Sequence, residues 1–376
     1  MNWTETRKEL HKHPEVSGEE QNTSDLVIKK LAEFGLTEIH RGFSEHSIIA
    51  ELIFEKAGRT VLFRCELDAL PIKESNTFDY RSKNEGVSHK CGHDGHITIM
   101  LGLIEKLKEN PLKKGRAIFL FQSSEEDGIG AKSIIDSGKL KELSPIDRVI
   151  ALHNVPGFKK NTIVCKNGSF TPSVESVDIH LRGKESHAGM PENGVGPAPA
   201  IAKLIDYFAE IHNPDASSNS YFLSTPIQLK MGQPAYGTAA GDALLSYTFR
   251  SWEFDFFQKQ KKQIIDKIGE IVKATSGLSV DLDWKQAFDA NINEEDTVKA
   301  IKKATSENDL NYINKNQPFP WGEDFGTFTQ EFQGAMFGLG SGKKTPELHN
   351  PDYDFPDEIR KTGIDMFYSL AKITLL

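Results

Sequence analysis

The chain has 376 residues, of which 38% are hydrophobic and 26% are charged, a composition typical of ordinary folded proteins. This length exceeds the size at which one hydrophobic core usually stops growing, so we expect two domains. The net charge of −9 argues against nucleic acid and against anionic membranes as partners.

No apolar run approaches the roughly 18 residues that a membrane span needs, and the N-terminal segment lacks the apolar core of a signal peptide. The 3 cysteines are too few, and odd in number, for a disulfide framework, which fits a reducing compartment. We therefore expect a cytoplasmic protein that does not bind membranes.

The first 170 residues alternate helical patterns with short apolar runs. Amphipathic or apolar spacing predicts helices at 3–12, 19–34, 97–107 and 130–137. The apolar runs predict strands at 47–54, 59–67, 115–122 and 148–152. This alternation is the signature of an α/β fold with a mostly parallel sheet covered by helices, in which ligands bind beyond the carboxyl ends of the strands.

Three of these predicted strands end at polar residues that are able to do chemistry. Asp68 follows the second strand, Glu125 and Glu126 follow the third, and His153 follows the fourth. One such residue is expected wherever a strand leaves the core. Three together, with the segment described next, indicate a functional site.

The segment HKCGHDGH, residues 89–96, concentrates groups that bind metals. Cys91 and His93 are two residues apart, so on extended backbone their side chains point the same way, whereas on a helix they diverge by roughly 200°. We therefore expect both on a loop just before the helix at 97–107. A thiolate with an imidazole suits a divalent ion such as zinc, which needs further ligands from elsewhere in the chain.

From about residue 170 the pattern changes to strand 174–182, helix 197–211, strands 225–232 and 242–252, helix 255–275 and strand 278–284. This βαββαβ order is that of a ferredoxin-like unit. We predict that residues 171–286 form an inserted domain, and that residues 1–170 and 287–376 form one metal-binding catalytic domain. The C-terminal part of the predicted catalytic domain contains a helix at 294–307, a strand at 334–340 and a helix at 357–373.

The sequence offers enough ligands for a two-metal site, in which paired divalent ions activate water and hold a carbonyl oxygen. In a Glu-Glu pair one carboxylate is able to bind metal while its neighbour moves a proton. The candidate groups are Asp68, Cys91, His93, Asp94, Glu125, Glu126, His153, Glu323, Asp324 and His349.

Motifs along nearly the whole chain resemble those of the metal-dependent amidohydrolases, a family that includes aminoacylases, hippurate hydrolases and N-acetyldiaminopimelate deacetylases. They are LHKHPE (10–15), RCELDALPI (64–72), HKCGHDGH (89–96), FQSSEE (121–126), ALHNVPG (151–157), GKESHAGMP (183–191), EDFG (323–326) and LHNPDYDFPDE (348–358). Several motifs in the right order are far more specific than any one of them.

The resemblance implies a zinc-peptidase-like catalytic domain with an inserted lid and dimerisation domain. It also implies a dinuclear site whose ligands are Cys91, as the bridge, with His93, Glu126, His153 and His349.

The resemblance to this family also implies catalytic or substrate-binding roles for four further residues. Glu125 would be the general base and acid, and Asp68 would orient a ligand or the base. His187, on the insertion, would reach into the partner subunit's site to steady the oxyanion, which implies a homodimer. Arg250, at the family's G-T-I-R position, would bind a substrate carboxylate.

Three positions depart from the family pattern. Glu66 stands where an aspartate is usual, Gly237 where an asparagine is usual, and Glu192 where a histidine is usual. The last two belong to the region that would hold the substrate and its tetrahedral intermediate. The substrate preference of better-known members therefore does not transfer to this chain.

The expected activity is hydrolysis of N-acyl amino acids, above all N-acetyl amino acids, with two zinc or manganese ions, or cobalt. N-acetyldiaminopimelate and small dipeptides are the alternative substrates. A different class of enzyme is a cysteine hydrolase with Cys91 as nucleophile and His93 or His153 as base. A third reading is a non-catalytic binding protein on the same fold.

Overall fold

The computed structural model describes residues 2–36 and 38–375, which form two compact units. Unit 1 holds the described residues up to Phe170, residues 291–318 and those from Glu323 onward. Unit 2 holds Thr171–Ala290 and Phe319–Gly322. The boundaries differ from the predicted ones in two places. The strand expected to end at 284 continues to Phe288, and the segment 319–322 joins unit 2 although no pattern in the sequence marks it.

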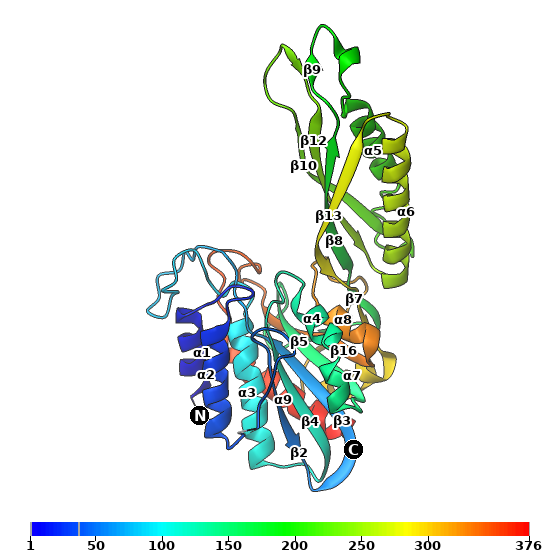
Figure 1. The fold of residues 1–376 in the computed structure, drawn as a ribbon. Helices are drawn as coiled ribbons and strands as arrows, with labels where there is room; N and C mark the ends of the chain where they lie inside the picture. Colours follow the sequence, from blue (N-terminus) through cyan, green and yellow to red (C-terminus); the bar gives the residue numbers. More distant parts are fainter. Residues whose placement is uncertain (1, 37, 376) are drawn as a thin grey trace. The chain divides into compact units, whose positions relative to one another are not determined.

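Unit 1 is built on an eight-stranded sheet (Figure 1). In spatial order its strands are β1 (His40–Arg41), β2 (Ile48–Ile53), β4 (Lys114–Gln122), β3 (Lys56–Glu66), β5 (Arg148–Pro156), β16 (Gly334–Gly342), β6 (Ile163–Cys165) and β15 (Tyr312–Asn314). The central pairs β4–β3, β3–β5 and β5–β16 are parallel, and β2 pairs antiparallel with β4. The predicted mostly parallel sheet is confirmed.

Helices cover both faces of this sheet. On one face the core contains Val61, Phe63 and Cys65 of β3, which alternate along the strand as a buried face requires. They pack with α1 (Trp3–Lys12), α2 (Gln21–Glu33), α3 (His93–Glu109), α7 (Glu295–Glu307) and α9 (Arg360–Thr374). On the opposite face lie α4 (Gly130–Asp136) and α8 (Phe325–Glu331), which pack against each other. Short 3-10 turns lie at Lys139–Leu143 and Asp357–Ile359.

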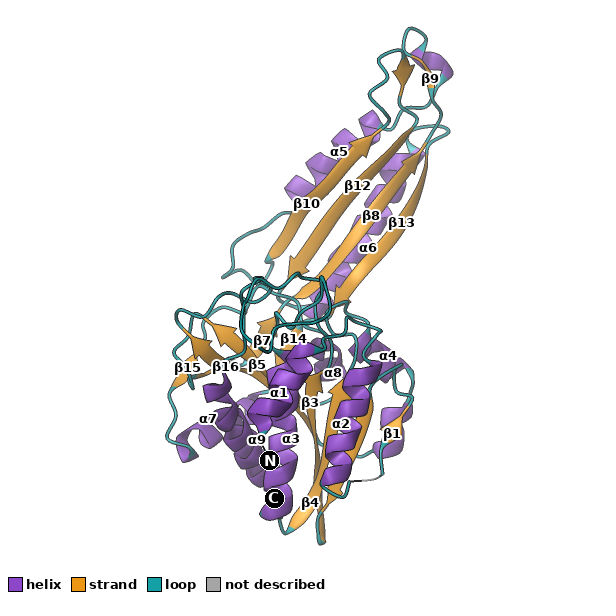
Figure 2. Ribbon diagram, turned by 90° about the vertical axis from the view of Figure 1, so that its left-hand side faces the viewer, coloured by secondary structure: helices purple, strands orange, loops and turns teal. Residues whose placement is uncertain are grey.

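Unit 2 is a four-stranded antiparallel sheet with two helices on one face (Figure 2). The strand order is β10 (Phe222–Met231), β12 (Asp242–Ser251), β8 (Ser173–Arg182) and β13 (Ser279–Phe288). The helices are α5 (Ala198–Glu210) and α6 (Phe254–Lys273), whose apolar faces bury alternate residues of β8. The elements follow the predicted βαββαβ order, and the strand order is that of a split βαβ unit.

Shorter elements complete the two units. In unit 2, β9 (Ser186–His187) pairs with β11 (Thr238–Ala239), and a 3-10 turn spans Pro191–Asn193. The strands β7 (Gly168–Thr171) and β14 (Asn291–Asn293) form a two-stranded sheet. Among the described residues, no helix is both long and apolar enough to cross a membrane.

Two predictions of local structure are wrong. His93 is not on an extended loop but is the first residue of α3, because Gly92 turns the chain with φ of 96° immediately before it. A Cβ atom at Gly92 would lie 2.6 Å from Oδ1 of Asn154, so only glycine fits this turn. His153 does not follow its strand but lies within β5, which continues to Pro156.

Candidate active site

Seven of the residues singled out in the sequence lie in unit 1, near the carboxyl ends of its parallel strands. Asp68 follows β3, and Glu125 and Glu126 follow β4. His153 is in β5, Cys91 and His93 meet at the start of α3, and His349 follows β16. This edge of a parallel sheet is where α/β proteins bind their ligands.

The five predicted metal ligands converge into two groups that share one residue. The ligand atoms of Cys91, His93 and His153 all lie within 4.8 Å of one another, and so do those of Cys91, Glu126 and His349. The Sγ atom of Cys91 lies 3.4 Å from Nε2 of His153. The carboxylate of Glu126 lies 3.8 Å from Nε2 of His93 and 3.6 Å from Nε2 of His349. Cys91 therefore stands where a bridging ligand would.

Unpaired polar atoms point to a cation at this place. Among the described residues, Nε2 of His93 and Oε1 of Glu126 are buried and have no hydrogen-bond partner. A buried polar atom without a partner costs free energy that a bound cation would recover. Thiolate, imidazole and carboxylate together suit a borderline divalent ion such as zinc. The residues present therefore fit the metal site that the sequence predicts.

Asp68 holds two of the proposed ligands in place. The Nδ1 atom of His93 lies close to both the main-chain and the side-chain oxygen of Asp68, at 2.8 and 3.3 Å. The other carboxylate oxygen of Asp68 accepts from the main-chain N–H of Glu126 at 2.9 Å and from the hydroxyl of Ser17 at 2.8 Å. Nε2 of His93 is thereby turned toward Glu126.

Glu125 lies beside the ligand groups. Its Oε2 atom is 3.9 Å from Nε2 of His93, and its Oε1 atom accepts from the main-chain N–H of Asp324 at 3.4 Å. Burial, together with the negative charges of Glu323 and Glu126, raises the pKa of Glu125 well above its usual value. A carboxyl group whose pKa is raised in this way is suited to carry a proton in general acid-base catalysis.

The thiol of Cys91 is not activated as a nucleophile, because its pKa is raised rather than lowered. Burial raises its pKa well above the usual value, and the neighbouring carboxylate of Glu126 raises it further. Reactive cysteines have a lowered pKa, which needs a positive neighbour such as a bound metal.

A buried ionic network lies behind Glu125. The guanidinium of Arg64 is paired with Glu66, with Glu323 at 3.0 Å and with Asp324 at 2.5 Å. His96 binds the other oxygen of Glu66 at 2.6 Å. The glutamate that departs from the family pattern at position 66 therefore reaches both a cation and an imidazole. Arg64 and His96 were not singled out as site residues, although both stand inside the recognised motifs.

His187 and Arg250 lie in unit 2, so the arrangement within unit 1 does not include them. His187 is exposed in β9, and its Nδ1 atom accepts from the main-chain N–H of Gly189 at 3.0 Å. The carbonyl of Gly237 accepts from the main-chain N–H of Ala188 at 2.9 Å, which places one departure from the family pattern beside His187. Arg250, in β12, donates to the carbonyl of Pro320 at 3.0 Å.

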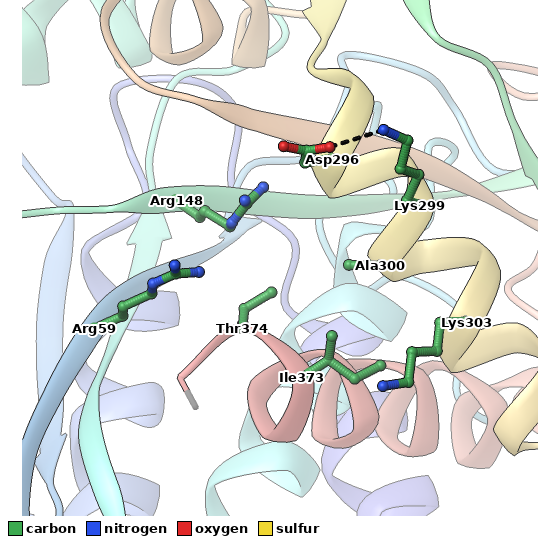
Figure 3. Close-up of a pocket in the computed structure, with 8 residues that line it drawn as sticks. All are labelled: Arg59, Arg148, Asp296, Lys299, Ala300, Lys303, Ile373 and Thr374. Atoms are coloured by element: carbon green, nitrogen blue, oxygen red, sulfur yellow. Dashed lines mark hydrogen bonds and ion pairs between the residues drawn. The ribbon is translucent and has the colours of Figure 1, made fainter.

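A separate cavity in unit 1 contains none of the candidate residues (Figure 3). It has a volume of about 270 Å³ and is lined by Arg59, Arg148, Asp296, Lys299, Ala300, Lys303, Ile373 and Thr374. Most of its cations have acidic partners. Arg148 binds Glu294 at 2.8 Å, and Lys299 binds Asp296 at 3.0 Å. We assign no function to this cavity.

Comparison with known proteins settles the family. Residues 62–373 match the model of peptidase family M20/M25/M40. The chain belongs to this family. As a member of the M20/M25/M40 peptidases it is a hydrolase that acts on amide bonds.

Relatives of known name cover nearly the whole chain. The N-acetyl-L-cysteine deacetylase of Bacillus subtilis is 30% identical over 367 residues, which are 97% of this chain and 86% of that protein. The N-acetyldiaminopimelate deacetylase of Exiguobacterium sibiricum is 29% identical over 354 residues, 94% of each chain. The crystal structure of a dinuclear metal-binding M20 peptidase from Bacillus subtilis shares the fold, with a TM-score of 0.83, 24% identity, and coverage of 99% of this chain and 97% of that one.

Proposed function

We propose that this M20/M25/M40 peptidase is a metal-dependent amidohydrolase that removes the acyl group, above all acetyl, from N-acyl amino acids. The observation that carries the proposal is the convergence of five ligand side chains beside the buried carboxyl group of Glu125. The names of the relatives support an N-acetyl amino acid as substrate, because they include deacetylases of N-acetyl-L-cysteine and of N-acetyldiaminopimelate.

Two divalent ions, zinc or manganese with cobalt as a further possibility, would bind the five side chains, with Cys91 shared between them. His93 and His153 would complete one ion's ligands, and Glu126 and His349 the other's, as the two groups of neighbouring ligand atoms suggest. Such ions supply Lewis acidity, which makes water a better nucleophile at neutral pH and polarises the carbonyl of the substrate.

Glu125 would move the proton that amide hydrolysis requires. An amine leaves poorly as an anion, so the nitrogen needs a proton before the C–N bond breaks. In our proposal the carboxylate of Glu125 accepts a proton from the attacking water and then delivers it to that nitrogen. The main-chain N–H of Asp324 holds the Oε1 atom of Glu125, which leaves Oε2 on the side of His93.

Unit 2 would supply the remaining groups. We propose that His187 of a second copy donates to the developing oxyanion, and that Arg250 binds the substrate carboxylate. A homodimer through unit 2 is supported by the apolar surface at the edge of its sheet. Leu229 and Met231 of the edge strand β10 are 54% and 46% exposed.

A cysteine hydrolase is the less favoured candidate. It would need Cys91 as a thiolate, whereas burial and Glu126 keep its pKa high. It also leaves Glu126 and His349 without a role in the chemistry. A non-catalytic binding protein is disfavoured because the five ligands and Glu125 are all present and close together.

The deciding experiment is a turnover screen of N-acetyl and other N-acyl amino acids, N-acetyldiaminopimelate, hippurate and small dipeptides. Each would be tested after removal of metal by a chelator and again with zinc, manganese or cobalt added. We expect no turnover without metal and restored cleavage of N-acetyl amino acids with it. Turnover that survives complete metal removal would favour the cysteine mechanism, and absence of turnover on every substrate would overturn the proposal.

A further inference from the structure

The turn that carries Glu125 and Glu126 is held at its main-chain amides by side chains from elsewhere in unit 1. The N–H of Ser123 donates to the hydroxyl of Ser47 at 2.9 Å. The N–H of Ser124 donates to Oε1 of Glu20 at 2.7 Å. The N–H of Glu126 donates to the carboxylate of Asp68 at 2.9 Å. Three of the four amides from 123 to 126 are thus fixed by contacts from outside the turn.

Ser124 needs such a contact more than its neighbours do. Its φ of 57° lies in the left-handed region, although it is not a glycine. For an L residue this conformation is unfavourable, so it persists only when the surroundings hold it. The N–H that donates to Glu20 belongs to this residue, which stands immediately before Glu125.

Glu20 is a buried acidic residue at the start of α2. Its side chain has no exposed surface, yet it makes no capping hydrogen bond to α2, which begins at the next residue. Its second oxygen, Oε2, has no hydrogen-bond partner among the described residues. Besides main-chain groups of its own loop, the carboxyl group of Glu20 is hydrogen-bonded to the main-chain N–H of Ser124, which is 104 residues further along the chain.

The carboxyl group of Glu20 is suited to remain neutral there. Burial, together with the negative charge of Asp68, raises its pKa to about 8. A neutral carboxyl group still accepts from the N–H of Ser124 through Oε1. The side-chain amide of glutamine has the same shape and offers the same acceptor.

We propose that Glu20 is a positioning residue, which holds Ser124 in its left-handed conformation and thereby aims Glu125 at the substrate and Glu126 at the metal site. The inference rests on the proposed function for the role of Glu125, but the fixing of the turn is independent of the substrate. Glu20 acts by accepting a hydrogen bond at one point, so the length of its side chain matters more than its charge.

Three substitutions separate position from charge. Glu20→Gln keeps the length and the acceptor but cannot ionise, Glu20→Asp can still ionise but is one methylene shorter, and Glu20→Ala loses both the acceptor and the ability to ionise. We expect kcat on the best N-acyl amino acid to stay near wild type in Glu20→Gln. We expect it to fall about 10- to 100-fold in the aspartate and alanine variants, with little change in KM. A role through charge alone would reverse the order of the glutamine and aspartate variants.

Glu15→Gln is the matched control. Glu15 comes from the same loop, and its carboxylate accepts from the main-chain N–H groups of Asn22 and Thr23 at the start of α2, at 3.2 and 2.8 Å, and so does not touch the turn. We expect it to reduce thermal stability and leave kcat unchanged.

Amide hydrogen exchange of residues 123–128 supplies a readout that needs no activity. We expect faster exchange of this segment in Glu20→Asp and Glu20→Ala than in wild type or Glu15→Gln, and weaker binding of zinc in a competition titration. Unchanged exchange in the aspartate variant would overturn the inference even if the alanine variant does not fold. If wild type cleaves no N-acyl amino acid while exchange responds as expected, the proposed function fails and the positioning role of Glu20 stands.

Discussion

The Nδ1 atom of His93 lies 2.8 Å from the main-chain oxygen of Asp68 and 3.3 Å from its carboxylate. This contact fixes the orientation of the imidazole ring, so that Nε2 faces Glu126. Because the same aspartate also accepts from the main-chain N–H of Glu126, one side chain sets the positions of two proposed ligands that are 33 residues apart in the chain.

Replacing Asp68 by alanine should weaken metal binding. Loss of a partner that orients a ligand typically lowers metal affinity or activity 10- to 100-fold. We expect a loss of this size for zinc, measured by competition with a chromophoric chelator. Asp127→Asn is the control. Asp127 directly follows the proposed ligand Glu126, but its carboxylate accepts from the main-chain N–H of Ile129. Equal affinities for wild type and Asp68→Ala would remove Asp68 from this role.

Glu125→Gln and Glu126→Gln should both lose activity, but for different reasons. The first removes the group that moves the proton, and general acid-base catalysis typically contributes 10²- to 10⁴-fold. We therefore expect Glu125→Gln to lose turnover by about this factor while it retains its metal. The second removes a proposed ligand and should lower the metal content, measured by elemental analysis of the purified protein. Near wild-type turnover in Glu125→Gln would show that the proton moves through another residue.

Regular patterns in the sequence predicted most of the fold. The βαββαβ unit could be read because its apolar residues repeat with the periods of strands and helices, and Val177, Ile179 and Leu181 of β8 do alternate into the core of unit 2. The candidate ligands could be named because they stand inside motifs that occur in the same order in a known family. Their convergence in unit 1 agrees with that reading.

Contacts between distant parts of the chain could not be read from the sequence. The start of α3 at His93 depends on Gly92 lying against Asn154, which is 62 residues further along the chain. Glu20 looks like an ordinary polar residue at a helix start until the structure places it against Ser124. The periodic spacing of apolar residues indicates which face of a helix or strand is buried, but not which other element covers that face.

The stability of the protein should fall at high pH because of His11. Burial alone would lower the pKa of this imidazole, but hydrogen bonds to Asp94 and Glu74 raise it to about 9. The folded-state pKa is thus above the unfolded value of about 6.5, so the contribution is fully present below pH 6.5 and is lost as the pH rises through 9. The shift to about 9 corresponds to at most about 3 kcal/mol.

Urea unfolding of the metal-free protein between pH 6 and 9.5, followed by circular dichroism, measures this loss. In His11→Gln the free energy of unfolding should depend less on pH over the same range, even if the variant is less stable throughout. Parallel curves for wild type and variant would show that other groups carry the pH dependence.

The edge of the sheet in unit 2 should be the surface that joins two copies of the chain. Leu229 and Met231 pair with Leu245 and Ala243 of β12, which face the core, so both lie on the helical side of the sheet. Ile205 of the neighbouring helix α5 is also partly exposed. A strand at a sheet edge with apolar side chains invites pairing with another chain.

Leu229→Lys should therefore give a monomer, because it places a charge in this apolar surface. Light scattering after gel filtration would measure the mass, with Ile53→Lys as the control, since Ile53 is 77% exposed but lies in unit 1. If His187 acts on the partner's substrate, the monomer should lose most of its turnover while it retains its metal. A variant that stays dimeric would place the interface elsewhere, and a fully active monomer would exclude the shared site.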